Sequence, residues 1–277
     1  MRRVAPLRYG VIFKKAFSNV DVFKGFVRDI LGIELEISHV ETEKEFKPTI
    51  GHVNIKFDLY AEDTKNHIVV EIQHDRNDDH YDRFLHYHCV AMLDQVKGAE
   101  EYRPLTTVYT IVILTSSDKH KCDVSVIDFD PKRLDNGLAL KQIKHKVIYI
   151  CPKYLNEKTP ALYQEWLKVI EDSLDNQVEE SDYQLSEIQT VLNCIEEDDI
   201  TPEERERMIE ESYMQKAEQR GLEEGFKLGV EQGRKEERLQ TKREMAEQLL
   251  KLGIEKNAIA QATGFSLLEI ESLNVDK

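Results

Sequence analysis

The sequence lacks several features that would place a protein in a broad class at once. It has only four cysteines among 277 residues, and none of them forms a C-x-x-C pair or another metal-finger spacing. No apolar run approaches the roughly 18 residues that a membrane-spanning helix needs, and no apolar signal region stands near the start. We therefore expect ordinary reduced thiols, no membrane span and a cytoplasmic location.

The chain also has fewer basic than acidic residues. The chain has 38 Lys and Arg against 53 Asp and Glu, a net charge of −15. Residues 1–180 carry −5 of this and residues 181–277 carry −10. A negative net charge argues against extensive non-specific binding of nucleic acid. It is compatible with a local basic groove and with a site that collects divalent metal ions.

Hydrophobic and charged residues are both plentiful. A hydrophobic content of 40% supports a real core, and 33% of charged residues exceeds the usual quarter, which points to a long polar helix. Periodicity then divides residues 1–176 into helices and strands. The predicted helices are 9–31 with a break at Ser18-Asn19, 80–96, and 159–174 with Thr159 as N-cap, and the predicted strands are 37–46, 52–61, 67–74, 106–114, 122–130 and 145–151. This order predicts an α/β fold: a mixed sheet flanked by helices.

The chain changes character after about residue 176. Residues 183–197 have the composition of one more helix, and a Thr-Pro-x-Glu start signal at Thr201 opens nearly fifty residues of helical composition. Within it, glycine recurs at every fourth position, and each glycine costs about 1 kcal/mol relative to alanine. Two interpretations stay open: a charged helix that tolerates glycine, or a face for helix pairing and homo-oligomerisation. The glycines are Gly221, Gly225, Gly229 and Gly233.

The last segment resembles the outline of a small helix-turn-helix. Residues 254–273 read as two short helices around a Thr-Gly turn. The second of them, "SLLEIESL", has acids and no Arg or Lys, so it lacks the donors that read bases. A small helical cap or a partner contact fits better. We therefore predict three regions, 1–176, 177–244 and 245–277.

The stretch "FDLYAEDTKNHIVVEIQH" places acids inside a predicted β-hairpin. In its second strand Glu71 and Gln73 alternate with an apolar face, and in its first strand Asp58 points away from Phe57 and Leu59. If the strands pair across their short connection, Asp58 lies beside or diagonal to Glu71. Two carboxylates that close repel each other unless a cation lies between them, and a divalent ion with hard oxygen ligands meets that need.

Other polar residues near the hairpin are less specific. Arg83 and Tyr87 lie one helical turn apart, on one face of the helix that follows. Lysines of the first helix, Lys14 among them, have the pattern of a solvated face, although they could line a DNA groove. Four histidines crowd the same region but match no standard zinc spacing, so histidines bordering a cleft are favoured over a zinc site. They are His74, His80, His86 and His88.

Several motifs together resemble a known family. "FDLYAED…VVEIQH" followed by "RFLHYHCVAML" and "KGAEEYRPLTTVYTIVIL" resembles the Rpn-type recombination-promoting nucleases, also described as transposases, of the PD-(D/E)xK superfamily. The resemblance covers about residues 5–175, and the glycine-repeat tail with "AQATGFSLLEI" also occurs in relatives. It implies a restriction-endonuclease-like fold, followed here by an extended helical C-terminal region. It also implies cleavage of DNA phosphodiesters with Mg²⁺ or Mn²⁺.

The resemblance assigns roles to the hairpin residues. Asp58 matches the metal-binding aspartate and Glu71 the second acid of an E-x-Q form, with the Ile72 carbonyl as a further metal ligand. Gln73 stands where many superfamily members have lysine, so it can position water or a phosphate oxygen but supplies no charge. Arg83 and Tyr87 are the expected phosphate contacts.

One position departs from the family pattern. Relatives often carry an acid a few residues before the "FK" of the first helix, where this chain has "RYGVIFKK" with Gly10. Asp21 or Asp29 are candidate replacements, or the acid is absent. Two hypotheses follow: a metal-dependent DNA endonuclease linked to recombination or transposition, or a catalytically inactive nuclease-fold protein that binds nucleic acid or assembles into oligomers.

Overall fold

Two compact units make up the part of the chain that the structure describes. The computed structural model describes residues 1–46, 55–74, 80–95 and 106–273. The first unit is Met1–Ser212 and the second is Tyr213–Lys277. All the candidate site residues of the hairpin belong to the first unit.

A six-stranded mixed sheet forms the centre of the first unit. Its order is β2-β3-β4-β5-β7-β6. β4, β5 and β7 run parallel, and the neighbouring pairs β2–β3, β3–β4 and β6–β7 are antiparallel. The predicted mixed sheet is therefore confirmed. The strands are β2 (Glu41–Phe46), β3 (Ile55–Glu62), β4 (Asn66–Gln73), β5 (Thr107–Leu114), β6 (Val124–Asp128) and β7 (Lys146–Ile150).

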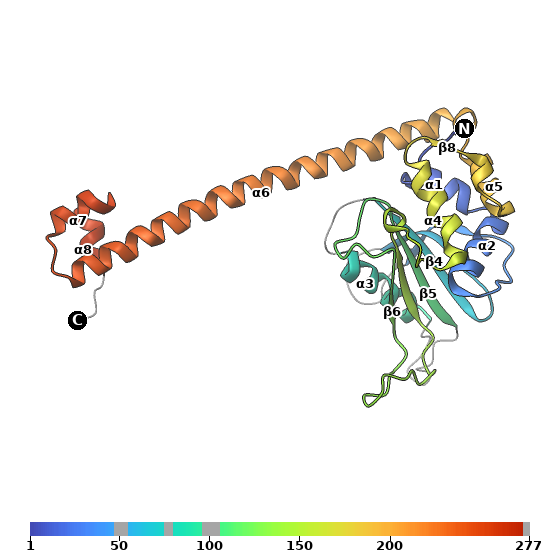
Figure 1. Cartoon of the computed structure of the whole chain (residues 1–277), viewed down its shortest axis with the longest axis horizontal. Coiled ribbons are helices and arrows are strands. Elements are labelled where there is room, and N and C mark those ends of the chain that lie inside the picture. The colour runs from blue at the N-terminus through green and yellow to red at the C-terminus, as the bar shows by residue number, and fades with distance from the viewer. Residues whose placement is uncertain (47–54, 75–79, 96–105, 274–277) are drawn as a thin grey trace. The chain divides into compact units, whose positions relative to one another are not determined.

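The β-branched strand β5 is buried on both faces, as its continuous apolar run predicts. Ile111 and Ile113 belong to one hydrophobic cluster, and Val108 and Val112 to clusters on the other face. Among the described residues, helices on both faces pack on the sheet (Figure 1). They are α1 (Gly10–Phe17), α2 (Val20–Leu31), α4 (Ala161–Ser173) and α5 (Ser186–Cys194) on one side, and α3 (His80–Leu93) on the other.

Local chemistry explains where these helices start and stop. The predicted break at Ser18-Asn19 is confirmed, because the Asn19 side chain accepts hydrogen bonds from the first amides of α2. Gly32 ends α2 with φ 68°, a conformation that suits glycine. The predicted N-cap of α4 is wrong: Pro160 precedes the helix, and the Thr159 hydroxyl instead donates to Asp123 Oδ2 at 2.5 Å.

Residues beyond 176 complete the core of the first unit. β8 (Gln177–Val178) pairs with β1 (Arg2–Arg3), and the buried Val178, Ile188 and Leu192 join the cluster that contains Trp166. In the described part of the chain, short 3₁₀ helices connect some of these elements: η1 (Pro152–Tyr154), η2 (Glu180–Asp182) and η3 (Glu197–Asp199). This packing ties the segment that precedes the long helix to the sheet domain.

The long helix α6 (Pro202–Lys251) begins in the first unit and continues into the second. In the second unit α7 (Lys256–Thr263) and α8 (Leu267–Ser272) pack with the end of α6 around Ala246, Ile259 and Ile270. The two predicted short helices are thus confirmed, and Ser266 and Glu269 form a capping box at the start of α8. None of the helices in the described ranges is long and apolar enough to cross a membrane.

Candidate active site

The strands β3 and β4 separate where the two acids stand. Their ladder runs from Glu62 opposite His67 to Leu59 opposite Val70. Beyond it, carboxylates take over the hydrogen bonding: the Asp58 amide donates to Glu71 Oε1 at 2.9 Å, and the Ile72 amide donates to Asp58 Oδ2 at 3.1 Å. Each acid is thereby bonded to the backbone of the opposite strand, and the two lie together as the hairpin predicts.

The side-chain alternation of β3 breaks at Asp58. The sequence predicts that Phe57 and Leu59 share a face, but Phe57 belongs to the same cluster as Tyr60 while Leu59 packs on the opposite side. Glu43 on β2, between the paired residues Thr42 and Lys44, has φ 58°. A non-glycine residue in this region costs about 1–2 kcal/mol. Regular pleating therefore stops beside the acid pair, which explains why the sequence pattern is wrong here.

Burial makes it energetically costly for Asp58 and Glu71 to be ionised at the same time. Glu71 is only 4% exposed, and its pKa is raised well above the usual value, first by burial and then by the charge of Asp58. Burial also raises the pKa of Asp58, while the hydrogen bond from Ile72 and the charge of Lys14 act in the opposite direction. The arrangement therefore favours either protonation of these acids or binding of a cation beside them.

A lysine of α1 reaches the acid pair. Lys14 Nζ lies 3.8 Å from Asp58 Oδ1 and donates to Glu43 Oε1 at 2.8 Å. Hydrogen bonds from Lys14 and Lys56 lower the pKa of Glu43 to about 2. The sequence pattern favours a solvated face for Lys14, and the structure differs because α1 packs against β3. In the sequence, Lys14 directly follows Phe13, which is buried, and this is the signal from which the position of Lys14 near the acid pair could have been predicted.

The expected phosphate-contact residues also come together. Arg83 Nη1 donates to Gln73 Oε1 at 3.2 Å, and Arg83 Nε donates to the Tyr87 hydroxyl at 3.2 Å. The guanidinium also lies 5.4 Å from the centre of the Tyr87 ring. The side-chain amide of Gln73 thus holds a cation on the side of β4 that α3 covers, next to Glu71.

The Ile72 carbonyl faces the same gap. In a β-strand the N–H and C=O of one residue point to the same side. Because the Ile72 amide donates to Asp58, the carbonyl is directed toward β3 as well. The three expected oxygen donors, from Asp58, Glu71 and Ile72, therefore border one space between the strands.

The structure does not bring the two suggested first-helix acids to this space. Asp29 is buried in the core on the other face, where Oδ2 accepts from Trp166 Nε1 at 2.8 Å and Oδ1 from Arg28 Nε at 2.9 Å. Asp21 is exposed in the first turn of α2. Within the described ranges no contact joins either residue to Asp58 or Glu71. Asp29 has a structural role, because its carboxylate accepts the hydrogen bond of the buried Trp166 indole.

An acid does stand at the start of α1, and it comes from α6. Glu211 Oε2 accepts from the Gly10 amide at 2.9 Å and Oε1 from the Val11 amide at 3.4 Å. A β-carbon added to Gly10 would lie 3.5 Å from Glu211 Oε1. Burial and the charge of Asp58 raise the pKa of Glu211, while its hydrogen bonds and Lys14 lower it. No local pattern in the sequence points to this residue.

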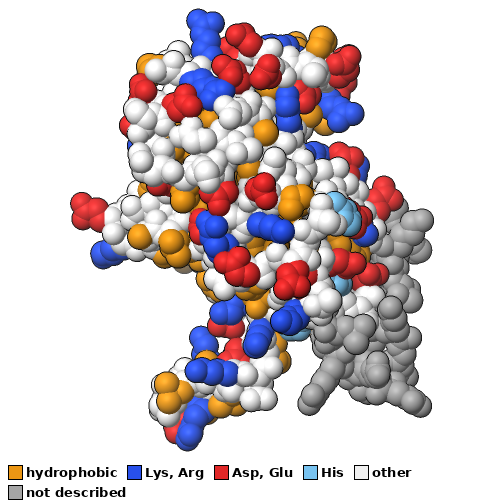
Figure 2. Space-filling model, turned by 90° about the vertical axis from the view of Figure 1, so that its right-hand side faces the viewer, with side chains coloured by type: hydrophobic (Ala, Val, Ile, Leu, Met, Phe, Trp, Pro, Cys, Tyr) orange, Lys and Arg blue, Asp and Glu red, His pale blue; other side chains and the backbone are white. Residues whose placement is uncertain are grey.

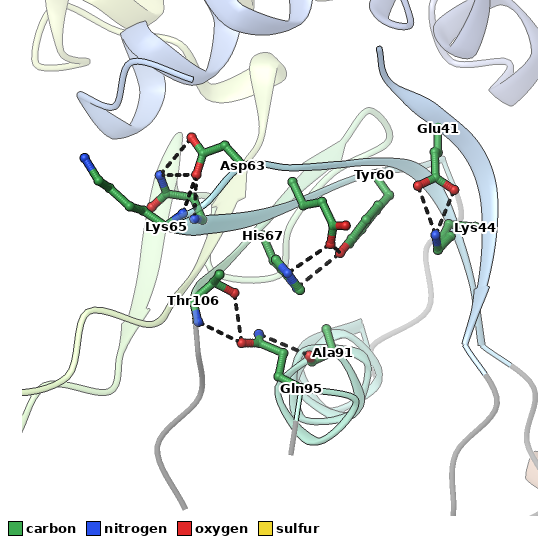
Figure 3. A network of polar contacts seen from close by, with 11 residues as sticks. Glu41, Lys44, Tyr60, Asp63, Lys65, His67, Ala91, Gln95 and Thr106 are labelled. Atoms are coloured by element: carbon green, nitrogen blue, oxygen red, sulfur yellow. Dashed lines mark hydrogen bonds and ion pairs between the residues drawn. The ribbon is translucent and has the colours of Figure 1, made fainter. Parts of the chain in front are cut away.

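The far end of the hairpin is anchored by a separate polar network (Figure 3). The Tyr60 hydroxyl donates to Glu62 Oε2 at 2.5 Å and lies 3.1 Å from His67 Nδ1. In the turn, Asp63 Oδ1 accepts from the amides of Lys65 and Asn66. These bonds fix the register of β3 and β4, and hence the place at which the acids meet.

No cluster typical of zinc is found among the residues that the structure describes, where no group of three or more His, Cys, Asp or Glu side chains could hold a metal. His74 Nδ1 lies 2.8 Å from the Thr115 hydroxyl, and His88 is buried against Thr110. The side chain of His80 lies outside the described part. Two carboxylates and a carbonyl suit Mg²⁺ instead, since this ion is usually held by one or two carboxylates together with water and substrate phosphate.

A known protein family matches most of the chain. The family model described as PD-(D/E)XK nuclease family transposase matches residues 9–224 of the chain. No curated protein and no solved structure matches the chain. The matched range contains the acid pair, α3 and Glu211. A mixed six-stranded sheet flanked by helices and followed by a long helix is consistent with the restriction-endonuclease-like fold of that family.

Proposed function

Because the chain belongs to the PD-(D/E)XK nuclease family of transposases, we propose that it is a metal-dependent DNA endonuclease acting in recombination or transposition. The observation that carries the proposal is the pair of hydrogen bonds by which Asp58 and Glu71 each bind the other's strand. Buried acids with raised pKa values destabilise a sheet, so their presence calls for a function. The proposal includes the cytoplasmic location that the sequence predicts.

The donor set fits a hard divalent cation. Asp58, Glu71 and the Ile72 carbonyl would hold Mg²⁺ or Mn²⁺, and the ion would neutralise the charge that burial makes costly. When bound, such an ion supplies an activated water and stabilises the negative charge that develops on the phosphoryl oxygens. Backbone hydrogen bonds fix both carboxylates, so these side chains would be held in place to bind the ion.

Two cations of the chain supply the charge that Gln73 lacks. Lys14 reaches Asp58 from α1, and in the proposal it stabilises negative charge on the scissile phosphate. Arg83, held by Gln73 and Tyr87, binds a phosphate oxygen from the opposite side. In this reading Gln73 is a positioning residue for Arg83.

Glu211 acts through α1. Its carboxylate fixes the first turn of the helix, and Lys14 lies one turn later on the same face as Gly10. The lysine therefore approaches Asp58 from a helix whose start is tied to α6. We assign Glu211 as a positioning residue for Lys14.

The test is cleavage of supercoiled plasmid in Mg²⁺, Mn²⁺ or EDTA. We expect the wild type to nick DNA only with metal, and the Asp58→Ala/Glu71→Ala variant to lose the activity. A Glu34→Ala/Glu157→Ala variant, which removes two exposed acids, is the matched control. A second readout is thermal stability: Mg²⁺ raises the melting temperature of the wild type but not of the double variant. Cleavage that survives in the double variant would place the active site elsewhere.

A second candidate function is nucleic-acid binding or assembly without cleavage. The exposed α6 favours it, because Leu222, Phe226 and Val230 repeat at four-residue spacing on a helix that is solvent-exposed in the second unit. Homo-oligomerisation through α6 is part of either function. DNA binding without cutting in any metal would support this second candidate.

A further inference from the structure

Three acids stand in one row across neighbouring strands of the sheet. The β2–β3 ladder has the same register on both sides of Glu43, and this register places Glu43 opposite Asp58. Continued by one residue, the β3–β4 ladder places Asp58 opposite Glu71. Glu43 therefore belongs to the row of the acid pair, although β2 lies at the edge of the sheet. Carboxylates directly opposite each other repel, so a cation is needed among them.

The ammonium of Lys14 lies among these acids, and it is hydrogen-bonded to Glu43. Lys14 Nζ donates to Glu43 Oε1 at 2.8 Å but lies 3.8 Å from Asp58 Oδ1, which is too far for a hydrogen bond. Lys56 Nζ lies 2.7 Å from the other oxygen of the same carboxylate, Glu43 Oε2. Two lysines thus fix Glu43, and Glu43 accepts the hydrogen bond that Lys14 would otherwise donate to Asp58.

The backbone of Glu43 is strained. Its φ of 58° lies in the left-handed region, which costs a non-glycine residue free energy relative to an extended strand. Glu41 and Lys44 are three residues apart and should lie on opposite faces of β2, yet a hydrogen bond of 2.8 Å joins them (Figure 3). The alternation of β3 breaks at Asp58, in the same row. Two neighbouring strands therefore depart from regular pleating where the three carboxylates meet.

Ion pairs are frequent on this protein, so the contact between Glu43 and Lys14 needs a second reason. Figure 2 shows Lys and Arg side chains interspersed with Asp and Glu over one face of the molecule. Exposed pairs of this kind usually contribute little to stability. A surface ion pair alone would not offset the backbone strain at Glu43, because such strain persists mainly where a site requires it.

We propose that Glu43 is a positioning residue, which keeps Lys14 beside Asp58 and prevents a direct hydrogen bond between them. The proposal rests on the proposed nuclease function. With its hydrogen bond directed to Glu43, the ammonium stays close enough to act on a scissile phosphate, and the Asp58 carboxylate stays available for a divalent cation. Glu211 fixes the helix from which Lys14 extends, whereas Glu43 fixes the end of its side chain.

The consequence concerns metal binding. Without Glu43, the ammonium of Lys14 would donate its hydrogen bond to Asp58 and compete with the metal ion for this carboxylate. Loss of Glu43 should therefore weaken metal binding, and removal of Lys14 should abolish that effect. If Glu43 were only a source of negative charge, it would attract the ion equally with or without Lys14. A double-mutant cycle separates the two roles.

The test is Mn²⁺ binding by the metal-free, full-length chain, measured by isothermal titration calorimetry without DNA. We expect Glu43→Gln to weaken binding by ~5-fold or more in the wild type and by less than ~2-fold in the Lys14→Met background. Glu45 is an exposed acid of the same strand, and Glu45→Gln should leave binding unchanged. An equal loss in the two backgrounds, or no loss in either, would overturn the proposal. A wild type that binds no Mn²⁺ would overturn the metal site itself, and this proposal with it.

A second measurement tests the strain and uses no metal. Glycine adopts a φ of 58° readily, so Glu43→Gly should keep or raise the urea midpoint of unfolding, although it removes two ion pairs. Glu45 pairs with Lys56 in the regular ladder, and Glu45→Gly should lower the midpoint. An equal fall in both variants would show that Glu43 serves the stability of β2, contrary to its assignment as a positioning residue. Neither measurement depends on cleavage, so the role of Glu43 and the nuclease activity are judged separately.

Discussion

Glu211 and Gly10 are 201 residues apart in the sequence and joined by a hydrogen bond of 2.9 Å in the fold. The carboxylate that caps α1 thus belongs to α6, in the part of this helix that lies within the first unit. A β-carbon at Gly10 would lie 3.5 Å from Glu211 Oε1, so an acid at position 10 would occupy nearly the same space. This geometry allows the role of Glu211 to be transferred from one element to another.

We expect Glu211→Ala to lower the metal-dependent cleavage rate by roughly 10- to 100-fold, the effect usual for partners that orient metal-site residues. Adding Gly10→Asp to Glu211→Ala should restore most of the rate, because it returns a carboxylate to the start of α1. Plasmid nicking as a function of Mg²⁺ concentration measures both effects. Glu210→Ala, an exposed neighbour on the same helix, is the control. A double variant that folds but gains nothing over Glu211→Ala would contradict the transfer.

Lys14 and Lys15 form a matched pair for testing charge at the site. Lys14 Nζ lies 3.8 Å from Asp58 Oδ1, whereas Lys15 Nζ pairs with Glu204 Oε2 at 2.9 Å. We expect Lys14→Met to reduce kcat by roughly 100-fold with a smaller change in KM, because its charge acts on the developing phosphoryl charge. Lys15→Met should leave kcat close to that of the wild type. Equal losses in the two variants would mean that Lys14 only supports the fold.

His88 makes the stability of the first unit depend on pH. Its ring is fully buried, stacked on Phe129 at 5.1 Å, and Nδ1 lies 2.9 Å from the Thr110 hydroxyl. Burial lowers the pKa of His88 from 6.5 to about 4 in the folded state. The unfolded chain therefore binds a proton at a higher pH than the folded one. The contribution of His88 to stability is fully present above pH ~6.5, declines as pH falls from ~6.5 to ~4, and is lost below that.

The expected loss is about 3 kcal/mol across that window. His88→Gln buries a group that does not titrate, so the free energy of unfolding of this variant should change less between pH 7 and pH 4. Urea unfolding of wild type and variant at several pH values gives the difference between them. A difference that stays constant across the series would show that the pKa of His88 is the same in the folded and unfolded states, which would contradict its lowering by burial.

The glycines of α6 can be replaced without steric conflict. Within the described part of the chain nothing lies within 4 Å of a β-carbon built at Gly221, Gly225, Gly229 or Gly233. Replacing all four with alanine should stabilise the helix by about 1 kcal/mol per position, seen as a more cooperative thermal loss of helical circular dichroism. Light scattering then decides between the two interpretations of the repeat. An unchanged mass favours the charged helix, and a lower mass identifies the glycines as a pairing face. A helix that is no more stable would contradict the free energy assigned to glycine here.

The amino-acid sequence alone was sufficient to predict the main helices, the strands of the central sheet and the acid-bearing hairpin, but not the β1–β8 pair. Each rests on local periodicity: the helical spacing over 9–31, the β-branched run of β5, and the alternation that puts Glu71 and Gln73 on one face. The same spacing placed Arg83 one turn from Tyr87, and the structure joins them at 3.2 Å. Interactions between neighbours in sequence are sufficient for such predictions.

The tertiary structure decided what surrounds the acids. Whether Lys14 faces solvent or Asp58 depends on how α1 packs on β3, and whether Asp29 serves the site or the core depends on the indole of Trp166. The strands separate at Asp58 because side-chain carboxylates replace backbone partners there, which no alternation pattern encodes. Glu211 reaches α1 only because β8 and α5 pack the intervening chain onto the domain. These contacts join residues far apart in sequence, and their free energy exists only once the core has formed.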